Sequence, residues 1–281
     1  MKQILRKLFR NILQIEIIWK LFYPIVRVGN FLQSQKEYYH HQKKEENFEK
    51  LKKHLYPPIV RNGPFKGLKY PEFISYGSAI FPKIIGSYES ELHPIIEEFC
   101  KKEYSQIINI GSGEGYYAVG LAMRIPNAVI HAYELLPEAQ KFIKQMAELN
   151  GVANRIVIHD KCTEEELLSF SYSNRTLIIC DCEGAEKEIF KQQIIKYISK
   201  CDLIIEVHDF VDINISDYLH HLFYETHSIK RIQSIDDIIK AKTYSYPELE
   251  TLDLSTKYFA LREGRPTIME WLILKSKYYN Q

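Results

Sequence analysis

Cysteine is scarce in this 281-residue chain and follows no disulfide or metal-binding pattern. The five cysteines are odd in number and form no C-x-x-C pair, which argues against a disulfide framework and against a zinc site. Charged residues interrupt the apolar start of the chain every few positions, so this start resembles neither a membrane span nor a cleavable signal peptide. Together these absences favour a reducing, cytoplasmic setting, with attachment at the inner membrane face as an alternative.

Several motifs and a strong overall charge are also missing. The chain has no G-x-S-x-G, H-E-x-x-H or Walker sequence, and its net charge is only +1. That value hides an asymmetry, because residues 1–66 hold 14 Lys and Arg against 5 Asp and Glu, whereas the remainder holds 23 against 31. The acidic second part argues against nucleic acid as a substrate, since phosphate-rich ligands need a basic track.

The first sixteen residues carry an apolar stripe at three- and four-residue steps, with basic residues opposite it. This pattern predicts an amphipathic basic helix whose stripe contains Ile4, Leu5, Leu8, Phe9, Ile12 and Ile15. We expect residues 1–30 to attach to an anionic membrane surface, with Trp19 and Phe22 at the interface, or to pack on the protein or on a second copy. Pro24 is expected to end or kink the helix.

Proline and glycine cluster between this extension and the rest of the chain, at Pro57-Pro58 and Asn62-Gly63-Pro64. We therefore predict two parts, a basic helical N-terminal extension over residues 1–70 and one α/β domain over residues 71–281.

The most informative stretch is an apolar run, Ile107 to Ile110, that ends in glycines at 111, 113 and 115. A buried strand followed by a glycine turn and a helix is the first half of a doubly wound nucleotide-binding fold. The dinucleotide fingerprint would need glycine or alanine at position 116, which is Tyr116 here. The turn therefore favours S-adenosylmethionine over NAD, and a purely structural turn is the alternative.

Further apolar runs alternate with segments long enough for helices, which predicts a Rossmann-like, doubly wound, mostly parallel seven-stranded sheet. The last two runs are expected to pair as a hairpin-like unit around a long insertion, residues 235–268. The other predicted strands are 128–134, 155–160, 176–181, 202–209, 227–234 and 269–276.

Acidic and basic side chains follow the second and third of these strands. Glu134 comes 23 residues after Gly111, where a carboxylate can accept from both ribose hydroxyls, although it could also simply cap a helix. Asp160, Lys161 and Cys162 end the third strand, at the edge expected to contact an adenine ring. Lys161 is unusual there, because it offers no acceptor for the adenine amino group.

The fourth strand ends in Asp181-Cys182-Glu183-Gly184-Ala185-Glu186. Carboxylates at this density are too costly for a core, so we expect them to orient a substrate, to act as a base or to bind a metal. Glu186 also fits the acidic N-terminus of a helix, where it would complement the helix dipole.

The fifth strand ends in Glu206-Val207-His208-Asp209, and strand alternation places Glu206 and His208 on one face and Val207 and Asp209 on the other. A histidine at this edge is suited to removing a hydroxyl proton, because it titrates near neutrality. Asp181, His208 and Asp209 could instead hold a divalent cation.

The segment before the first strand, residues 78–94, is predicted to start a helix near Ser87 and Ser90. It either forms a lid that carries Lys83, Tyr88 and Glu91 towards the ligand or packs as an ordinary helix.

With these stretches in place, the chain resembles the class I S-adenosylmethionine-dependent methyltransferases. The glycine turn, Glu134 and Asp181 match the ordered motifs of that superfamily. D-x-E-G-x-E at 181–186, followed by E-x-H at 206–208, is similar more narrowly to the FkbM-type family. The resemblance covers about residues 75–275 and departs from the family pattern at Lys161 and at the basic extension.

This resemblance implies methyl transfer to a hydroxyl of a sugar or natural-product-type small molecule, with no tight metal requirement. His208 is expected to be the base, Asp181 and Glu183 to orient the acceptor, and Asp209 to support them. The expected cofactor contacts are Asn109, Gly111, Ser112, Gly113, Glu114, Gly115, Tyr116, Glu134, Leu135, Lys161, Cys162 and Asp181. Two other functions remain open, a non-catalytic nucleotide-binding module anchored by its N-terminal helix and an NAD-type Rossmann enzyme.

Overall fold

A computed structural model describes residues 16–172 and 175–280, and the amphipathic helix predicted for the first residues lies largely outside them. Contacts divide the chain into two units, with the division after Lys53. Helix α2 (Glu16–His54) belongs to the first unit as far as Lys53. It continues through Pro24, so of the two predicted outcomes, an end or a kink at this proline, the end does not occur. Among the described residues, no helix combines the length and apolarity needed to span a bilayer. Residues 54–70, which the sequence assigned to the extension, belong to the second unit.

The second unit is built on a seven-stranded sheet in the order β3-β2-β1-β4-β5-β7-β6. The first five strands are parallel, and β7 pairs antiparallel with both β5 and β6. This confirms the predicted mostly parallel sheet and its terminal antiparallel pair. The strands are β1 (Gln106–Ile110), β2 (Val129–Tyr133), β3 (Ile156–His159), β4 (Thr176–Cys180), β5 (Asp202–Val207), β6 (His227–Gln233) and β7 (Glu270–Ser276).

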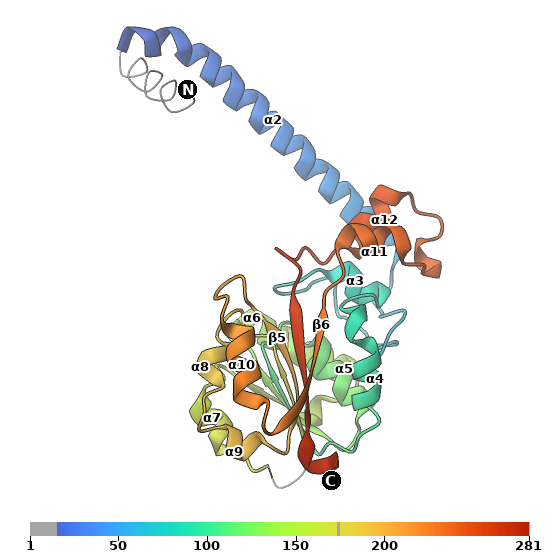
Figure 1. Ribbon diagram of the computed structural model, residues 1–281. Helices are drawn as coiled ribbons and strands as arrows, with labels where there is room; N and C mark the ends of the chain where they lie inside the picture. The colour runs from blue at the N-terminus through green and yellow to red at the C-terminus, as the bar shows by residue number, and fades with distance from the viewer. Residues whose placement is uncertain (1–15, 173–174, 281) are drawn as a thin grey trace. The chain divides into compact units, whose positions relative to one another are not determined.

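Helices cover both faces of the sheet, as expected for a parallel sheet. Figure 1 shows α8 and α10 on one side of the sheet and α4 and α5 on the other. The helices that flank the sheet are α4 (His93–Phe99), α5 (Tyr116–Arg124), α6 (Pro137–Leu149), α7 (Glu164–Ser169), α8 (Glu186–Ile189), α9 (Ile195–Ile198) and α10 (Ile215–Phe223). Short 3-10 helices lie at η1 (Ser90–Leu92), η2 (Ala153–Arg155), η3 (Pro247–Leu249) and η4 (Lys277–Asn280).

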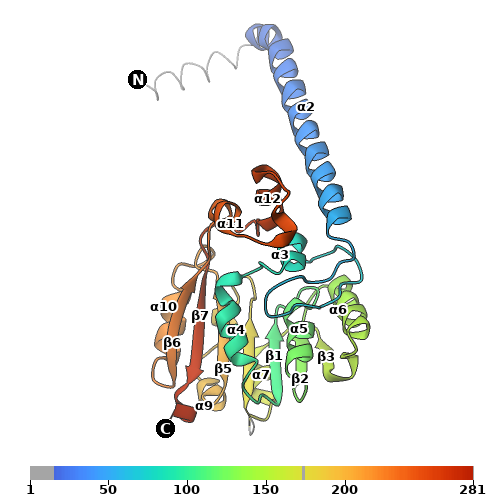
Figure 2. The same cartoon turned by 90° about the vertical axis from the view of Figure 1, so that its right-hand side faces the viewer.

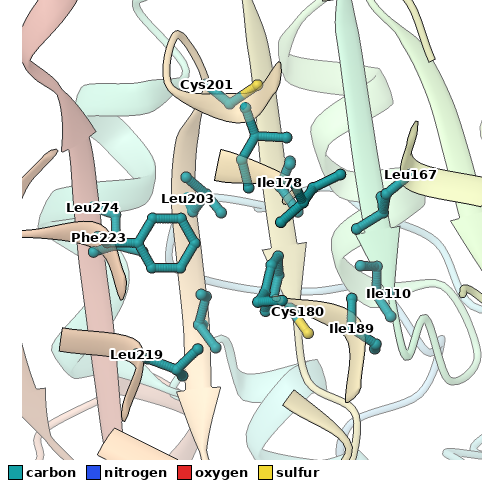
Figure 3. Packing of buried hydrophobic residues seen from close by; sticks show 14 of the residues in the cluster. Ile110, Leu167, Ile178, Cys180, Ile189, Cys201, Leu203, Leu219, Phe223 and Leu274 are labelled. Carbon is teal, nitrogen blue, oxygen red and sulfur yellow. The ribbon is translucent and has the colours of Figure 1, made fainter. Parts of the chain in front are cut away.

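One face of the sheet carries a large apolar core, shown in Figure 3. Alternate residues of the central strands, such as Ile110, Ile178 and Leu203, pack there against Phe223 of α10 and Ile189 of α8. Because side chains alternate along a strand, the residues between them face the other side of the sheet.

The insertion between β6 and β7 contains α11 (Asp237–Thr243) and α12 (Leu254–Leu261). Figure 2 shows both at the same end of the sheet as α3 (Ile80–Ile85), the end to which the parallel strands point. Buried ion pairs of Lys240 in α11 with Glu91 and Glu263 help to hold the insertion there. The insertion therefore adds a wall beside the carboxyl ends of the strands.

Candidate functional site

A pocket of about 410 Å³ lies where the strand order reverses, between β1 and β4. In doubly wound sheets, ligands bind at this switch point, outside the carboxyl ends of the strands. Its sheet side is formed by Asn109, Ile179, Ile204, Glu206 and Trp271, which lie on the face opposite the apolar core in matching register.

The glycine turn borders the pocket, but packing explains two of its glycines. A Cβ at Gly111, whose φ is +74°, would lie 1.6 Å from the backbone oxygen of Asp181. A Cβ at Gly115 would crowd Val119 and Ile143 at 3.2–3.3 Å. These glycines therefore allow β1, β4 and α5 to pack closely, so the glycine pattern alone is not evidence for a ligand.

Glu134 and Asn109 give better evidence for one. Both oxygens of Glu134 accept backbone N–H groups, from Gly113 at 2.8 Å and from Leu136 at 2.9 Å, which fixes the carboxylate at the pocket edge. Asn109 is only 1% exposed, yet its Oδ1 has no hydrogen-bond partner in the described residues. A buried acceptor without a donor is costly, so Asn109 is suited to a ligand that donates to it.

Glu114, expected to contact the cofactor, is instead fully buried outside the pocket. Its Oε1 pairs with Lys83 Nζ at 2.5 Å, and its carboxylate also accepts from Tyr70, Ser75 and the backbone of Tyr76. The sequence did not reveal this role, because the partners lie 31 to 44 residues away. Through these hydrogen bonds, Glu114 links the segment before α3 to the glycine turn.

Four other expected cofactor contacts do not line the pocket: Gly115, Leu135, Lys161 and Cys162. Leu135 is 65% exposed and Lys161 is also exposed, whereas Cys162 belongs to the apolar core on the opposite face. The expected contacts that do line it are Asn109, Gly111, Ser112, Gly113, Tyr116, Glu134 and Asp181.

The predicted lid segment is divided between two environments. Lys83 and Tyr88 line the pocket, whereas Glu91 accepts from the backbone of Ile235 and pairs with Lys240 of α11. All six residues of α3 are buried, so the segment is a packed wall rather than an exposed flap.

His208 is the best-defined catalytic candidate, because both ring nitrogens have carboxylate neighbours. Nδ1 donates to the buried Glu186 at 2.6 Å, and Nε2 lies 3.5 Å from Asp181 Oδ1 and 3.5 Å from Glu183 Oε2. The Nε2 distances are too long for strong hydrogen bonds, so this nitrogen remains available to a ligand. The predicted face alternation holds, since Glu206 and His208 line the pocket and Val207 packs in the core.

Two carboxylates differ in role from the prediction. Asp209 does not line the pocket, and its side chain accepts from the backbone N–H of Ser216 at 2.9 Å, near the start of α10. Glu186 lies in the first turn of α8, as its interpretation as a helix-dipole acid predicts, and it also orients His208, which the sequence did not predict. Within the described ranges, the atoms that could hold a metal ion are therefore those of Asp181, Glu183 and His208, which lie within 4.8 Å of one another, and not the predicted set with Asp209.

The insertion supplies Arg265, which the sequence did not identify. Its guanidinium pairs with Glu89 at 2.7 Å, with Glu263 at 2.9 Å and with Glu206 of β5, and it stacks on Trp271. No sequence signal marked this network, because it joins residues up to 176 positions apart.

The excess of carboxylates shifts their titration. Desolvation in the pocket, together with the charges of Glu89 and Glu183, raises the pKa of Asp181 to about 7. Burial and the charge of Asp181 likewise raise the pKa of Glu206. Burial alone would lower the pKa of His208, but the hydrogen bond and charge of Glu186 raise it above its usual value. The pocket therefore favours an incoming positive charge.

Comparisons with known proteins give limited similarity. No model of a known protein family matches the chain. A release factor glutamine methyltransferase from Deinococcus radiodurans is 35% identical over 66 residues, and the match covers 24% of each chain, about a quarter of the length of that curated relative.

Among solved structures, a precorrin-6y C5,15-methyltransferase from Geobacter metallireducens superposes with a TM-score of 0.43 at 14% identity, covering 68% of this chain and 88% of the other. An rRNA methylase from Streptococcus thermophilus superposes with a TM-score of 0.44 at 11% identity, covering 66% and 96%. Likenesses at this level are not evidence for a shared reaction or substrate.

Proposed function

We propose that the protein is an S-adenosylmethionine-dependent methyltransferase that methylates a hydroxyl of a sugar or natural-product-type small molecule. The observation that carries the proposal is the pocket at the β1–β4 switch point, which is lined by a fixed Glu134, by His208 and by Asn109, whose Oδ1 has no partner among the described residues. The acidic motifs that resemble the FkbM-type family, at 181–186 and 206–208, border the same pocket.

The residues present fit this cofactor. Glu134 has one lone pair left on each oxygen for ribose hydroxyls, since each already accepts one backbone N–H. Asn109 offers its free oxygen to the cofactor amino group. When bound, S-adenosylmethionine supplies an electrophilic methyl group.

His208 serves as the proton acceptor for the hydroxyl. Glu186 holds Nδ1 protonated, so the lone pair of the neutral ring lies on Nε2, which faces the pocket. Asp181 and Glu183 lie beside Nε2 and orient the acceptor. A positioned base of this kind contributes about 10²- to 10⁴-fold in rate.

Titration calorimetry with S-adenosylmethionine tests the cofactor assignment. Glu134→Gln should weaken binding by about tenfold, because it removes a charge-assisted acceptor. Glu138→Gln, an exposed acid at the start of α6, is the matched control and should bind as the wild type does. Absence of binding to the wild-type protein would refute the proposal.

Turnover of the His208→Ala variant tests the base. Methyl transfer from labelled S-adenosylmethionine to the small molecules of a cell extract should fall by about 10² or more, with cofactor affinity kept. His221→Ala, on the exposed side of α10, should be unaffected. Unchanged turnover of His208→Ala would remove this residue from the mechanism, and binding without any transfer by the wild type would point to a non-catalytic module.

A further inference from the structure

The pocket has more negative charge than its own cations balance. The described residues that line it include one lysine and one arginine, and both are engaged, Lys83 by Glu114 and Arg265 by three carboxylates. An anionic group on a ligand would therefore find no available lysine or arginine among these residues and would be repelled by the carboxylates. The carboxylates that line the pocket are Glu89, Glu134, Asp181, Glu183, Glu206 and Glu263.

The uncompensated charge is concentrated next to His208. In the described part of the chain, neither Asp181 nor Glu183 forms an ion pair with a lysine or arginine. Asp181 Oδ1 is closed to solvent and has no hydrogen-bond partner among the described residues. This acceptor is suited to a ligand that brings N–H or O–H donors.

Backbone strain accompanies this arrangement. The only described non-glycine residues with positive φ are Glu89, at 48°, and Glu183, at 54°, and both line the pocket. Left-handed backbone is unfavourable for glutamate, and strain of this kind concentrates at functional sites. At Glu183 it holds the carboxylate 3.5 Å from Nε2 of His208.

We propose that the acceptor carries an ammonium group close to the hydroxyl that is methylated, as in an amino sugar or another amino alcohol. This inference rests on the proposed function and names the substrate class of the same site. The ammonium lies against Asp181 and Glu183 and donates to their oxygens, while the hydroxyl faces Nε2 of His208. An aliphatic amine has a pKa of about 10, so at neutral pH it brings both the positive charge and three donors.

A divalent cation would satisfy the same carboxylates, but it would also take Nε2 of His208 as a ligand. The proposed reaction needs this nitrogen to receive the hydroxyl proton. An ammonium leaves Nε2 free, and for this reason the geometry favours an amine over a metal ion.

Separation of candidate acceptors by charge tests whether the acceptor carries an ammonium group. Small molecules of a cell extract are separated on a cation exchanger at pH 7, and each fraction is given to the full chain with methyl-labelled S-adenosylmethionine. Label should enter compounds of the bound fraction, and treating that fraction with acetic anhydride in water, which acylates amines, should abolish transfer. Fragmentation mass spectrometry should place the methyl group on oxygen.

Transfer to the unbound fraction, or transfer that survives acetylation, would overturn the proposal that the acceptor carries an ammonium group. It would leave the methyltransferase assignment intact. A methyl group on nitrogen would also overturn it, because an amine held between two carboxylates is protonated and not nucleophilic. Absence of transfer to every fraction would instead remove the proposed function and this inference with it.

Two further measurements locate the ammonium. Glu183→Gln should raise KM for the bound-fraction acceptor by about tenfold without changing cofactor affinity, whereas Glu188→Gln, an exposed acid of α8, should leave KM unchanged. Equal KM values for the two variants would overturn the assignment. Loss of transfer in EDTA, with recovery on adding Mg²⁺ or Mn²⁺, would assign the carboxylates to a metal and overturn it too.

Discussion

Lys83→Met should destabilise the protein severely, because it leaves the Glu114 carboxylate buried without its cation. Lys83 and Glu114 side chains are 5% and 0% exposed and 2.5 Å apart. Removing one partner of such a pair costs about 3–5 kcal/mol, since the remaining charge keeps its desolvation penalty. For a chain of this size, that loss corresponds to a fall of about 6–20 °C in Tm.

The double variant Lys83→Met/Glu114→Gln should recover most of this loss. Glutamine keeps an acceptor for the Tyr70 hydroxyl and carries no charge, so the penalty for an unpaired ion disappears. Urea denaturation of the wild type, both single variants and the double variant gives the coupling free energy. A loss below about 1 kcal/mol for Lys83→Met, or a double variant no more stable than the weaker single variant, would refute the structural role.

The same variants distinguish the structure from the sequence prediction for Glu114. A direct cofactor contact predicts that the double variant binds S-adenosylmethionine as poorly as Glu114→Gln does. A purely structural role predicts that the double variant regains affinity together with stability, which calorimetry measures.

Two further predictions concern pH and the N-terminal unit. Because the pKa of Asp181 is raised from 3.8 to about 7, folded protein binds more protons than unfolded protein in this range, so the free energy of unfolding should fall as pH rises from about 4 to 7. His208, whose pKa is also raised, acts in the same direction, and Asp181→Asn should flatten the pH profile measured by urea denaturation; an unchanged profile would contradict the shift. Residues 1–30 should carry the chain onto vesicles that contain phosphatidylglycerol but not onto neutral ones, since residues 1–66 are basic and Phe22, Ile25 and Phe31 of α2 are exposed. Failure to co-sediment, with a mass that grows with concentration, would favour self-association instead.

The sheet could be predicted from the sequence because its signals are local. Runs of β-branched residues such as Ile107 to Ile110 end at turn residues, and the segments between them have helical length. Strand ends also indicate which side chains meet at one edge, which is why Glu134, Asp181 and His208 were placed together.

The contacts that define each role could not be predicted, because they depend on distant packing. Glu114 directly follows Gly113, but its orientation is decided by Lys83 in a separate segment. Arg265 meets Glu206 across 59 residues and Glu89 across 176. Cys162 follows the expected strand yet packs into the core instead of the pocket.

The two acidic motifs of the sequence, at 181–186 and 206–208, meet around His208 in the structure. Gly184, with φ +101°, bends the chain after Glu183, and a Cβ there would meet Val211 at 2.9 Å. The bend brings Glu186 to Nδ1 of His208, while Glu183 stays beside Nε2. The spacing D-x-E-G-x-E therefore places an acid beside each nitrogen of one imidazole. It can do so only when the histidine of E-x-H lies at the end of the neighbouring strand.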